Sequence, residues 1–356
     1  MDFNRRLCES LSGLVGSRPE EIVVMNTLTV NLHLLMVSFF RPREKRRKIL
    51  IEKHAFPSDR YAVQSQLKFH GLDPAADLVE LAPRDGEHLI EESSVEDYLA
   101  AHGAEIALVL WPGVQYITGQ AFKLPRIARA ARLAGANIGF DLAHHVGNLP
   151  LELHDSGCDF AAWCHYKYLN AGPGAVAGGF VHAKHHKNTD LPRFNGWWGN
   201  ARQSRFRMAH DFEAEHGADA WQISTPLLLS MAPLSASLQL FDEAGSGPLR
   251  SKSVAMTSYL VQGIHAQLHQ LLEILTPMEP ERRGSQLSLR VRSGRDEGRA
   301  LFEYLEDQGV LTDWREPDVI RVAPVPLYNS FRDCFELLRT IGNWASVRGN
   351  PSRQSA

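Results

Sequence analysis

The sequence contains few cysteines and no stretch with the character of a secretory signal or a membrane anchor, and its basic run at residues 41–48 is better explained as a solvated connection than as a nuclear signal or a phosphate-binding patch. Its four cysteines, among 356 residues, show no Cys-x-x-Cys spacing, which argues against a zinc ribbon or a thioredoxin-type site and for reduced, packed thiols. The first residues have no apolar core. The most apolar stretch, residues 28–40, is too short to span a bilayer and contains Asn31 and His33. We therefore expect a cytoplasmic protein with no membrane partner.

The sequence also lacks a strong excess of charge of either sign. Lys and Arg number 38 against 41 Asp and Glu, a formal net charge of −3 at pH 7. This balance gives no general electrostatic reason to expect a nucleic acid as partner. With 44% hydrophobic and 22% charged residues, the chain can bury a full core in one large or two smaller domains. These values favour a soluble globular protein that binds small molecules.

Strand and helix patterns alternate through the first half of the chain. Short apolar runs, most of them followed by a turn and a helical pattern, predict strands at residues 21–25, 48–52, 106–111, 137–141, 159–166 and 175–182. This repeated order predicts an α/β fold. We expect a largely parallel sheet covered by helices, with ligand-binding loops at the carboxyl ends of the strands.

The pattern changes near Pro226, where long helical stretches begin. The chain beyond them alternates strand patterns with two more helices, which suits a small α+β domain. The sequence therefore predicts a large domain over residues 1–245, a small C-terminal domain over 246–349 and a frayed tail over 350–356.

Two short stretches carry the chemical signal. Asp141 ends a predicted strand in Gly-Phe-Asp-Leu-Ala-His-His, and Lys167 follows the next strand in His-Tyr-Lys-Tyr-Leu-Asn, before the glycine-rich run 171–174. Taken alone, Asp141 is equally a turn residue or a helix cap, and Lys167 a surface lysine. Together they fit a pyridoxal phosphate (PLP) site. An acid can keep the pyridine nitrogen protonated, while a lysine forms a Schiff base with the cofactor aldehyde.

Other residues are compatible with the same cofactor. Leu28 and Thr29 open a helix directly after a strand, so they could receive a phosphate at the positive end of the helix dipole, although simple capping also explains them. Phe56 could stack on a planar ring, but an aromatic residue after a strand more often belongs to the core. His144 follows Asp141 by three residues and could contact the ring or be structural.

Three further features have more than one interpretation. The pair Trp197-Trp198 lies between two glycines and indicates a pocket wall, a subunit contact or a local cluster. Arg321 lies in an apparent strand, where a bidentate grip on a substrate carboxylate would explain it. The histidines at 182, 185 and 186 have the composition of metal ligands, but no nearby carboxylate or cysteine completes a set. We interpret them as exposed loop histidines and predict no metal site.

These motifs together resemble the kynureninase family, PLP-dependent hydrolases of the aspartate-aminotransferase fold, which is fold type I. The resemblance extends from Ile22 to Trp344 and includes the segments 25–33, 56–59, 139–144, 166–172, 196–197 and 321–331. It implies a mostly parallel seven-stranded sheet and a smaller α+β domain. It also implies hydrolysis of L-kynurenine or 3-hydroxy-L-kynurenine to anthranilate or 3-hydroxyanthranilate and L-alanine, in tryptophan catabolism and NAD biosynthesis.

The resemblance implies roles for individual residues. Lys167 would form the Schiff base and Asp141 would contact the pyridine nitrogen. Tyr166 would lie near the phosphate and is a candidate proton relay, and Arg321 would hold the substrate α-carboxylate. The other implied cofactor contacts are Leu28, Thr29, Phe56, Pro57, Ser58, Asp59 and His144, with Trp197 and Thr225 reaching the phosphate across the interface of a homodimer.

The sequence departs from the family pattern in three places. Thr225 stands where animal members carry asparagine, and Pro112 stands where some members use a cofactor-contacting serine. Only a short stretch precedes Ile22, so we expect a chain that lacks the family's amino-terminal segment. Two alternatives stay open. One is a truncated, catalytically impaired remnant that binds PLP or dimerises. The other is a related lyase or desulfurase, although such enzymes usually place histidine before the lysine and need a mobile cysteine.

Overall fold

The computed structural model describes residues 3–348, and the predicted tail over 350–356 lies outside this range. The chain divides into two compact units. Unit 1 comprises Met1–Gly113 and Phe122–Glu243, and unit 2 comprises Val114–Ala121 and Ala244–Ala356. The division after Glu243 lies close to the predicted boundary at 245. The inclusion of Val114–Ala121 in unit 2 differs from the prediction, which assigned these residues to the large domain.

A seven-stranded sheet forms the centre of unit 1, in the order β1-β7-β6-β5-β4-β2-β3. Strands β2 to β6 pair in parallel, whereas β7 runs antiparallel to both of its neighbours, β6 and β1. The strands are β1 Ile22–Val24, β2 Lys48–Glu52, β3 Leu78–Leu81, β4 Ile106–Pro112, β5 Asn137–Asp141, β6 Phe160–Cys164 and β7 Ala177–Val181. The predicted largely parallel sheet is confirmed.

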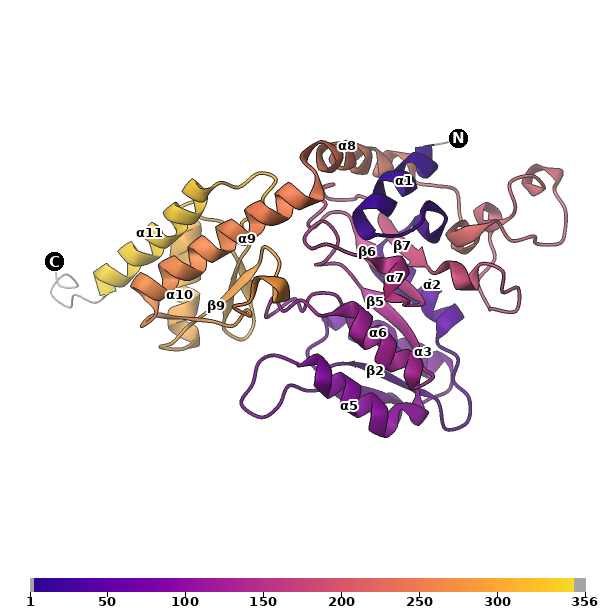
Figure 1. Ribbon diagram of the computed structural model, residues 1–356, viewed down its shortest axis with the longest axis horizontal. Coiled ribbons are helices and arrows are strands. Elements are labelled where there is room, and N and C mark those ends of the chain that lie inside the picture. Colours follow the sequence, from indigo (N-terminus) through magenta and orange to yellow (C-terminus); the bar gives the residue numbers. More distant parts are fainter. Residues whose placement is uncertain (1–2, 349–356) are drawn as a thin grey trace. The chain divides into compact units, whose positions relative to one another are not determined.

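Helices cover this sheet, and several of them pack against one another, most extensively α2 with α3 and α5 with α6 (Figure 1). The core beneath α2 contains apolar side chains of that helix, including Leu32 and Phe39, together with Ile51 of β2 and Leu108 of β4. The helices of unit 1 are α1 Phe3–Val15, α2 Leu28–Phe39, α3 Pro57–Phe69, α4 Pro74–Asp77, α5 Glu92–His102, α6 Leu124–Leu133, α7 Leu153–Ser156 and most of α8 Leu228–Ala244.

One glycine decides how closely β5 and β6 can pack. Gly139 of β5 lies opposite Phe160 of β6, and a Cβ atom at this position would overlap the Phe160 ring. Any larger residue would push the two strands apart. Because β5 ends at Asp141 and β6 leads to Lys167, this contact sets the positions of both residues.

Unit 2 is a four-stranded antiparallel sheet with three helices. The strand order is β10-β11-β9-β8, and the core includes Leu260, Leu289, Ile320 and Leu338. The elements are α9 Ser246–Gly263, β8 Leu272–Ile274, β9 Leu287–Val291, α10 Arg295–Asp307, β10 Asp313–Arg315, β11 Val319–Val322 and α11 Phe331–Arg348. The smaller α+β unit that the sequence predicted is therefore present.

The segment Val114–Ala121 leaves unit 1 directly after β4 and is held within unit 2. The Gln286 side chain donates to the Tyr116 carbonyl at 3.1 Å, and Ser288 Oγ donates to the Ile117 carbonyl. Thr276 Oγ1 donates to the Thr118 carbonyl at 2.6 Å. These side chains satisfy backbone carbonyls that a short buried segment would otherwise leave without partners.

Two further expectations concern cysteines and membrane spans. All four cysteines are buried and unpaired, as expected for packed thiols. Within residues 3–348, no helix combines the length and the apolar character needed to cross a membrane.

Candidate functional site

The carboxyl ends of parallel strands bring three of the predicted site residues of unit 1 together. Asp141 is the last residue of β5, and Lys167 follows β6 by three residues. Phe56 follows β2, at the N-terminus of α3. The Lys167 Nζ atom lies 5.6 Å from the centroid of the Phe56 ring. The structure therefore unites these three residues at the sheet edge where α/β proteins bind ligands.

A second carboxyl group, that of Asp59, lies against Asp141. Asp59 is in the first turn of α3, and both side chains are buried, with 7% and 8% of their surface exposed. Burial raises the pKa of Asp59 well above its ordinary value, and the Asp141 charge and a side-chain hydrogen bond to Asp141 raise it further, while Lys167 opposes the shift. The raised pKa favours the protonated form of Asp59, which can donate a hydrogen bond to Asp141.

This acid pair fits the cofactor that the sequence predicts. Asp141 Oδ1 accepts a hydrogen bond from the Ala143 backbone N–H at 2.7 Å. Asp59 Oδ1 is buried and has no hydrogen-bond partner within residues 3–348. A buried acid pair with an unused oxygen, beside a lysine, suits a cationic N–H donor such as a protonated pyridine nitrogen.

Two helix N-termini meet at a hydroxyl pair near this edge. Thr29 Oγ1, in the first turn of α2, lies 2.9 Å from Ser58 Oγ, in the first turn of α3. Leu28 and Pro57 are the first residues of these helices. Backbone N–H groups and two positive helix ends therefore converge with two hydroxyls, an arrangement that favours a phosphate.

Tyr166 precedes Lys167 and is half-exposed, with 49% of its surface accessible. Burial of the hydroxyl raises the pKa of Tyr166 to about 12, helped by its hydrogen bond with Cys164 and by the Asp141 charge. The phenol is therefore protonated at neutral pH and can act as an O–H donor.

A buried histidine holds the backbone just ahead of these residues. The His165 Nε2 atom accepts a hydrogen bond from Trp163 Nε1 at 2.8 Å, and His165 Nδ1 lies 2.5 Å from the Val176 carbonyl. Burial lowers the pKa of His165 to about 4, so the ring is neutral. The sequence analysis did not identify the Trp163–His165 pair. The available signal was a histidine within an apolar strand, two residues before the lysine.

The turn after β6 is closed by backbone hydrogen bonds. The Asn170 N–H donates to the Lys167 carbonyl at 2.9 Å, and the Ala171 N–H donates to the His165 carbonyl at 3.0 Å. Gly172 and Gly174 then adopt positive φ angles of 77° and 78°. Side chains other than glycine rarely take this conformation, so the glycine-rich run allows the chain to return as β7.

Two more predicted positions lie at this edge. The His144 ring packs edge-on against the Tyr168 ring, with 5.9 Å between centroids. Pro112 lies beside Asp141 in the β4–β5 pair. Because proline has no side-chain donor, it offers the cofactor only backbone and van der Waals contacts.

Trp197 and Thr225 are not brought to Lys167 within the described chain. The Trp197 ring contacts Phe206 at 5.7 Å between centroids, and Thr225 is exposed. Within residues 3–348, neither has a hydrogen bond, ion pair or ring contact with Lys167 or Asp141. Their predicted role requires a second subunit.

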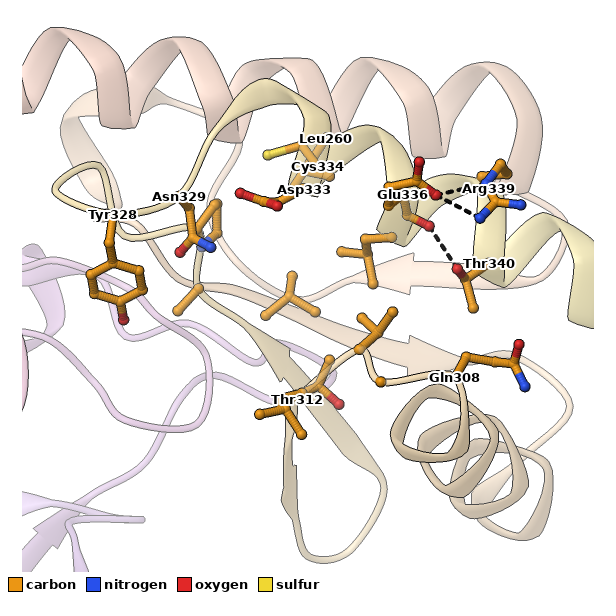
Figure 2. Close-up of a pocket in the computed structure, with 17 residues that line it drawn as sticks. Leu260, Gln308, Thr312, Tyr328, Asn329, Asp333, Cys334, Glu336, Arg339 and Thr340 are labelled. Carbon is orange, nitrogen blue, oxygen red and sulfur yellow. Dashed lines mark hydrogen bonds and ion pairs between the residues drawn. The ribbon is translucent and has the colours of Figure 1, made fainter.

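Arg321 belongs to unit 2, where it lies in β11 with 8% of its surface exposed. Its Nη1 atom donates to the Tyr116 carbonyl at 2.7 Å, and its Nη2 atom donates to Asp313 Oδ2. A separate cavity of unit 2, of about 640 Å³, lies between α11 and the loops after α10 and β11 (Figure 2). Figure 2 shows Thr312, Tyr328 and Asp333 around it, and none of the predicted site residues lines it.

The interpretation of the three histidines as exposed loop residues is wrong. Each is only partly exposed. His185 Nε2 lies 2.8 Å from Asp159 Oδ1, and His186 Nε2 lies 2.9 Å from the Val181 carbonyl. Their hydrogen-bond partners lie at the ends of neighbouring strands, so the short helical turn after β7 packs onto the sheet instead of projecting into solvent.

His182 joins Glu21 and His154 in a cluster whose potential metal-ligand atoms lie within 4.8 Å of one another. Burial alone would raise the pKa of Glu21, but hydrogen bonds from the Arg18 and Ala183 N–H groups and from His154 outweigh it and lower that pKa. Because these donors already use both Glu21 oxygens, we interpret the cluster as a hydrogen-bonded contact between α7, β7 and the chain before β1.

Comparison with known structures identifies the fold. The cysteine desulfurase of Thermococcus onnurineus superposes with a TM-score of 0.79 at 15% identity, covering 97% of this chain and 84% of that one. A C-DES mutant with glycine covalently linked to its PLP cofactor gives 0.79 at 19% identity, covering 96% and 86%. The predicted fold of PLP-dependent enzymes is confirmed.

Comparison with known sequences identifies the family. Residues 249–341 match the kynureninase C-terminal domain. The protein named kynureninase from Stenotrophomonas maltophilia is 57% identical over 347 residues, which cover 98% of this chain and 82% of that protein. The kynureninase from Xanthomonas campestris is 56% identical over the same coverage. Identity at this level over nearly the whole length shows that the chain belongs to the kynureninase family.

Proposed function

We propose that this protein is a PLP-dependent hydrolase that cleaves the Cβ–Cγ bond of L-kynurenine or 3-hydroxy-L-kynurenine. One water is consumed: Cγ becomes the carboxyl carbon of anthranilate or 3-hydroxyanthranilate, and Cβ becomes the methyl carbon of L-alanine. The observation that carries the proposal is Lys167 beside the buried Asp59–Asp141 pair, in a chain 57% identical to a kynureninase.

Different site residues would contact different parts of the cofactor. Asp141, supported by Asp59, would hold the pyridine nitrogen, and Phe56 and His144 would contact the ring. The phosphate would be bound by the first turns of α2 and α3, through Leu28, Thr29, Pro57 and Ser58, with Tyr166 of the same subunit and Trp197 and Thr225 of a second one. When bound, PLP supplies an electron sink for the negative charge that develops on the substrate carbons.

The protein groups then supply proton transfer and orientation. Once its amine is neutral, Lys167 Nζ can remove the proton from the substrate α-carbon. The Tyr166 hydroxyl remains protonated at neutral pH because its pKa is raised to about 12, so it can deliver a proton to Cβ as the carbon–carbon bond breaks. Arg321 would bind the substrate α-carboxylate through its guanidinium.

Sulfur chemistry, the activity of several proteins with this fold, is disfavoured. Desulfurases need a reactive thiolate, whereas all four cysteines here are buried. Burial raises the pKa of Cys158 to about 12 and that of Cys334 to about 11. The residue before Lys167 is also tyrosine, not histidine.

We further propose a cytoplasmic role in tryptophan catabolism or NAD biosynthesis. Four buried, unpaired thiols are in keeping with a reducing compartment, and the substrate is a tryptophan breakdown product. Comparing kynurenine-pathway metabolites in cells with and without the gene tests this role, and unchanged kynurenine levels would contradict it.

Replacing Lys167 tests the activity directly. The purified protein with PLP should show visible absorbance from the bound cofactor, become labelled at Lys167 on borohydride reduction, and release fluorescent anthranilate from L-kynurenine. Lys167→Ala should abolish the label and the product, whereas Lys68→Ala, an exposed lysine of α3, should retain both. Labelling without anthranilate would identify a catalytically impaired remnant, and no labelling would refute the assignment.

The acid pair predicts unequal effects of two similar substitutions. Asp141→Asn removes the charge that faces the pyridine nitrogen, so PLP affinity should fall about a hundredfold. Asp59→Asn keeps a hydrogen-bond donor at this position and should change the affinity less than about threefold, because the raised pKa of Asp59 favours its neutral form. Fluorescence titration with PLP at pH 7 measures both. Equal losses would mean that Asp59 is ionised.

Replacing Tyr166 tests the proton relay. Tyr166→Phe removes the hydroxyl and keeps the ring, so kcat should fall on the order of a hundredfold while PLP still binds. Tyr98→Phe, in α5 and outside the site, serves as the control and should leave kcat unchanged. Normal turnover by the Tyr166 variant with bound cofactor would exclude the role.

A homodimer follows from the predicted roles of Trp197 and Thr225. The stretch of chain around them carries several exposed apolar side chains, namely Phe194, Trp197, Phe206, Met208, Leu227, Leu228 and Leu229. Leu229 has 92% of its surface exposed. Exposure of this many large apolar side chains within one stretch of chain favours a surface that a partner covers.

Leu229→Glu tests this interface. The unmodified chain, of 39.8 kDa, should elute as a dimer in light scattering. The variant should shift to monomer because a charge would be desolvated in the interface, and its PLP affinity should fall as the partner residues are lost. Leu133→Glu, an equally apolar exposed position on α6, should remain dimeric. A dimeric Leu229 variant with normal PLP affinity would contradict the interface.

A further inference from the structure

Arg321 is paired with an acidic residue, Asp313, across two antiparallel strands. In the β10–β11 ladder, Asp313 lies directly opposite Arg321. Opposite residues of an antiparallel pair project from the same face of the sheet and lie close enough to interact. The register therefore places the Asp313 carboxylate beside Arg321 without any contribution from a flexible loop.

Two groups fix the guanidinium of Arg321 from different directions. Its Nη2 atom donates to Asp313 Oδ2, and its Nη1 atom donates to the Tyr116 carbonyl at 2.7 Å. Tyr116 is in the Val114–Ala121 segment, which Gln286 and Ser288 hold in place. An arginine side chain loses much rotamer freedom when it binds a ligand in a single orientation. Two fixed acceptors remove most of that freedom before a ligand arrives.

The guanidinium nevertheless keeps donors for a ligand. Of its five N–H groups, the described residues engage two, and the Nε atom is buried with no partner within residues 3–348. An arginine fork with free donors on a planar edge matches the two oxygens of a carboxylate.

Asp313 pairs with two arginines, so its single negative charge does not neutralise both of them. Asp313 Oδ2 also accepts a hydrogen bond from Arg315 Nη2 at 2.9 Å. One carboxylate thus faces two guanidinium groups, and the group of three retains a net charge of +1. An approaching anion meets a positive site whose principal donor is already oriented.

We propose that Asp313 is a positioning residue for this enzyme: together with the Tyr116 carbonyl, it orients the Arg321 guanidinium to receive the α-carboxylate of the amino-acid substrate. The inference rests on the proposed function, which makes Arg321 the carboxylate anchor. It adds a residue that acts on the substrate only through Arg321, and it makes substrate binding depend on the register of β10 and β11.

Three variants of the full chain test whether Asp313 orients Arg321 for the substrate or competes with the substrate for it. In Asp313→Ala, Arg321 loses one of its two fixed acceptors, so the affinity for L-kynurenine, measured from the absorbance change of the bound cofactor, should fall about tenfold. The KM should rise in parallel while kcat changes less than about twofold. Asp313→Asn keeps an acceptor oxygen at the same place and should recover most of the affinity. Asp318→Ala, an acid in the same hairpin that pairs with Arg290, is the control and should bind normally.

The amine that corresponds to kynurenine without its α-carboxylate distinguishes an orienting role of Asp313 from general damage to the site. Because it lacks the carboxylate, its competitive inhibition should be the same in Asp313→Ala and in the unmodified protein. Weakened inhibition by the amine would overturn the inference, because it would indicate general damage to the site. Unchanged or tighter kynurenine binding in Asp313→Ala would also overturn it, because Asp313 would then be only a competitor for Arg321.

Arg321→Gln distinguishes the inference from the function on which it rests. If this variant binds kynurenine normally, the carboxylate anchor lies elsewhere and the proposed role of Arg321 fails together with the inference. If Arg321→Gln weakens binding and Asp313→Ala does not, the anchor is correct and only the positioning role of Asp313 is refuted.

Discussion

Two buried carboxyl groups lie in contact beside a lysine, and unit 1 is arranged to keep them together. The Asp59–Asp141 pair is buried, where two ionised carboxylates would repel each other at a high cost in free energy. Protonation of Asp59, which its raised pKa favours, would leave a single negative charge that can face either Lys167 or a cationic ring nitrogen. The sheet must therefore hold the end of β5 against the start of α3 and leave room for a flat, charged ligand at that edge.

The fold meets this constraint with small residues and neutral polar pairs. Gly139 lets β5 approach the Phe160 ring of β6, so the two strands end side by side. His165 stays neutral because it is buried, with a pKa of about 4, and it uses both ring nitrogens in hydrogen bonds. The backbone that carries Lys167 is thereby fixed without a further charge near the acid pair.

Apolar periodicity in the sequence predicted the strands that are buried on both faces. The predicted ranges around β2, β4 and β5 agree with the structure within a residue, because buried parallel strands are continuous apolar runs. Strand β10, Asp-Trp-Arg, escaped prediction since its three residues are only partly buried and its identity depends on pairing with β11. Local patterns carry no information about such pairing.

Contacts between residues distant in the sequence explain the other differences. Nothing near Val114 indicates that its segment packs in unit 2, because the side chains that hold it, such as Thr276 and Gln286, come much later in the chain. Likewise, His182 was interpreted without Glu21, whose carboxylate approaches it only in the folded sheet. Motifs in the sequence predicted the candidate site residues, whereas the raised pKa of Asp59 could be recognised only once its burial and its contact with Asp141 were known.

The division of the chain into two units also separates the residues that we propose for the cofactor from the one that we propose for the substrate carboxylate. The former belong to unit 1, and Arg321 belongs to unit 2. The chain leaves unit 1 one residue after Pro112, which lies beside Asp141, and within three more residues it supplies the Tyr116 carbonyl to Arg321. A single stretch of backbone thus carries both a neighbour of Asp141 in unit 1 and a hydrogen-bond acceptor for Arg321 in unit 2. Substitutions in this stretch would change the surroundings of both residues, even where no side chain touches a ligand.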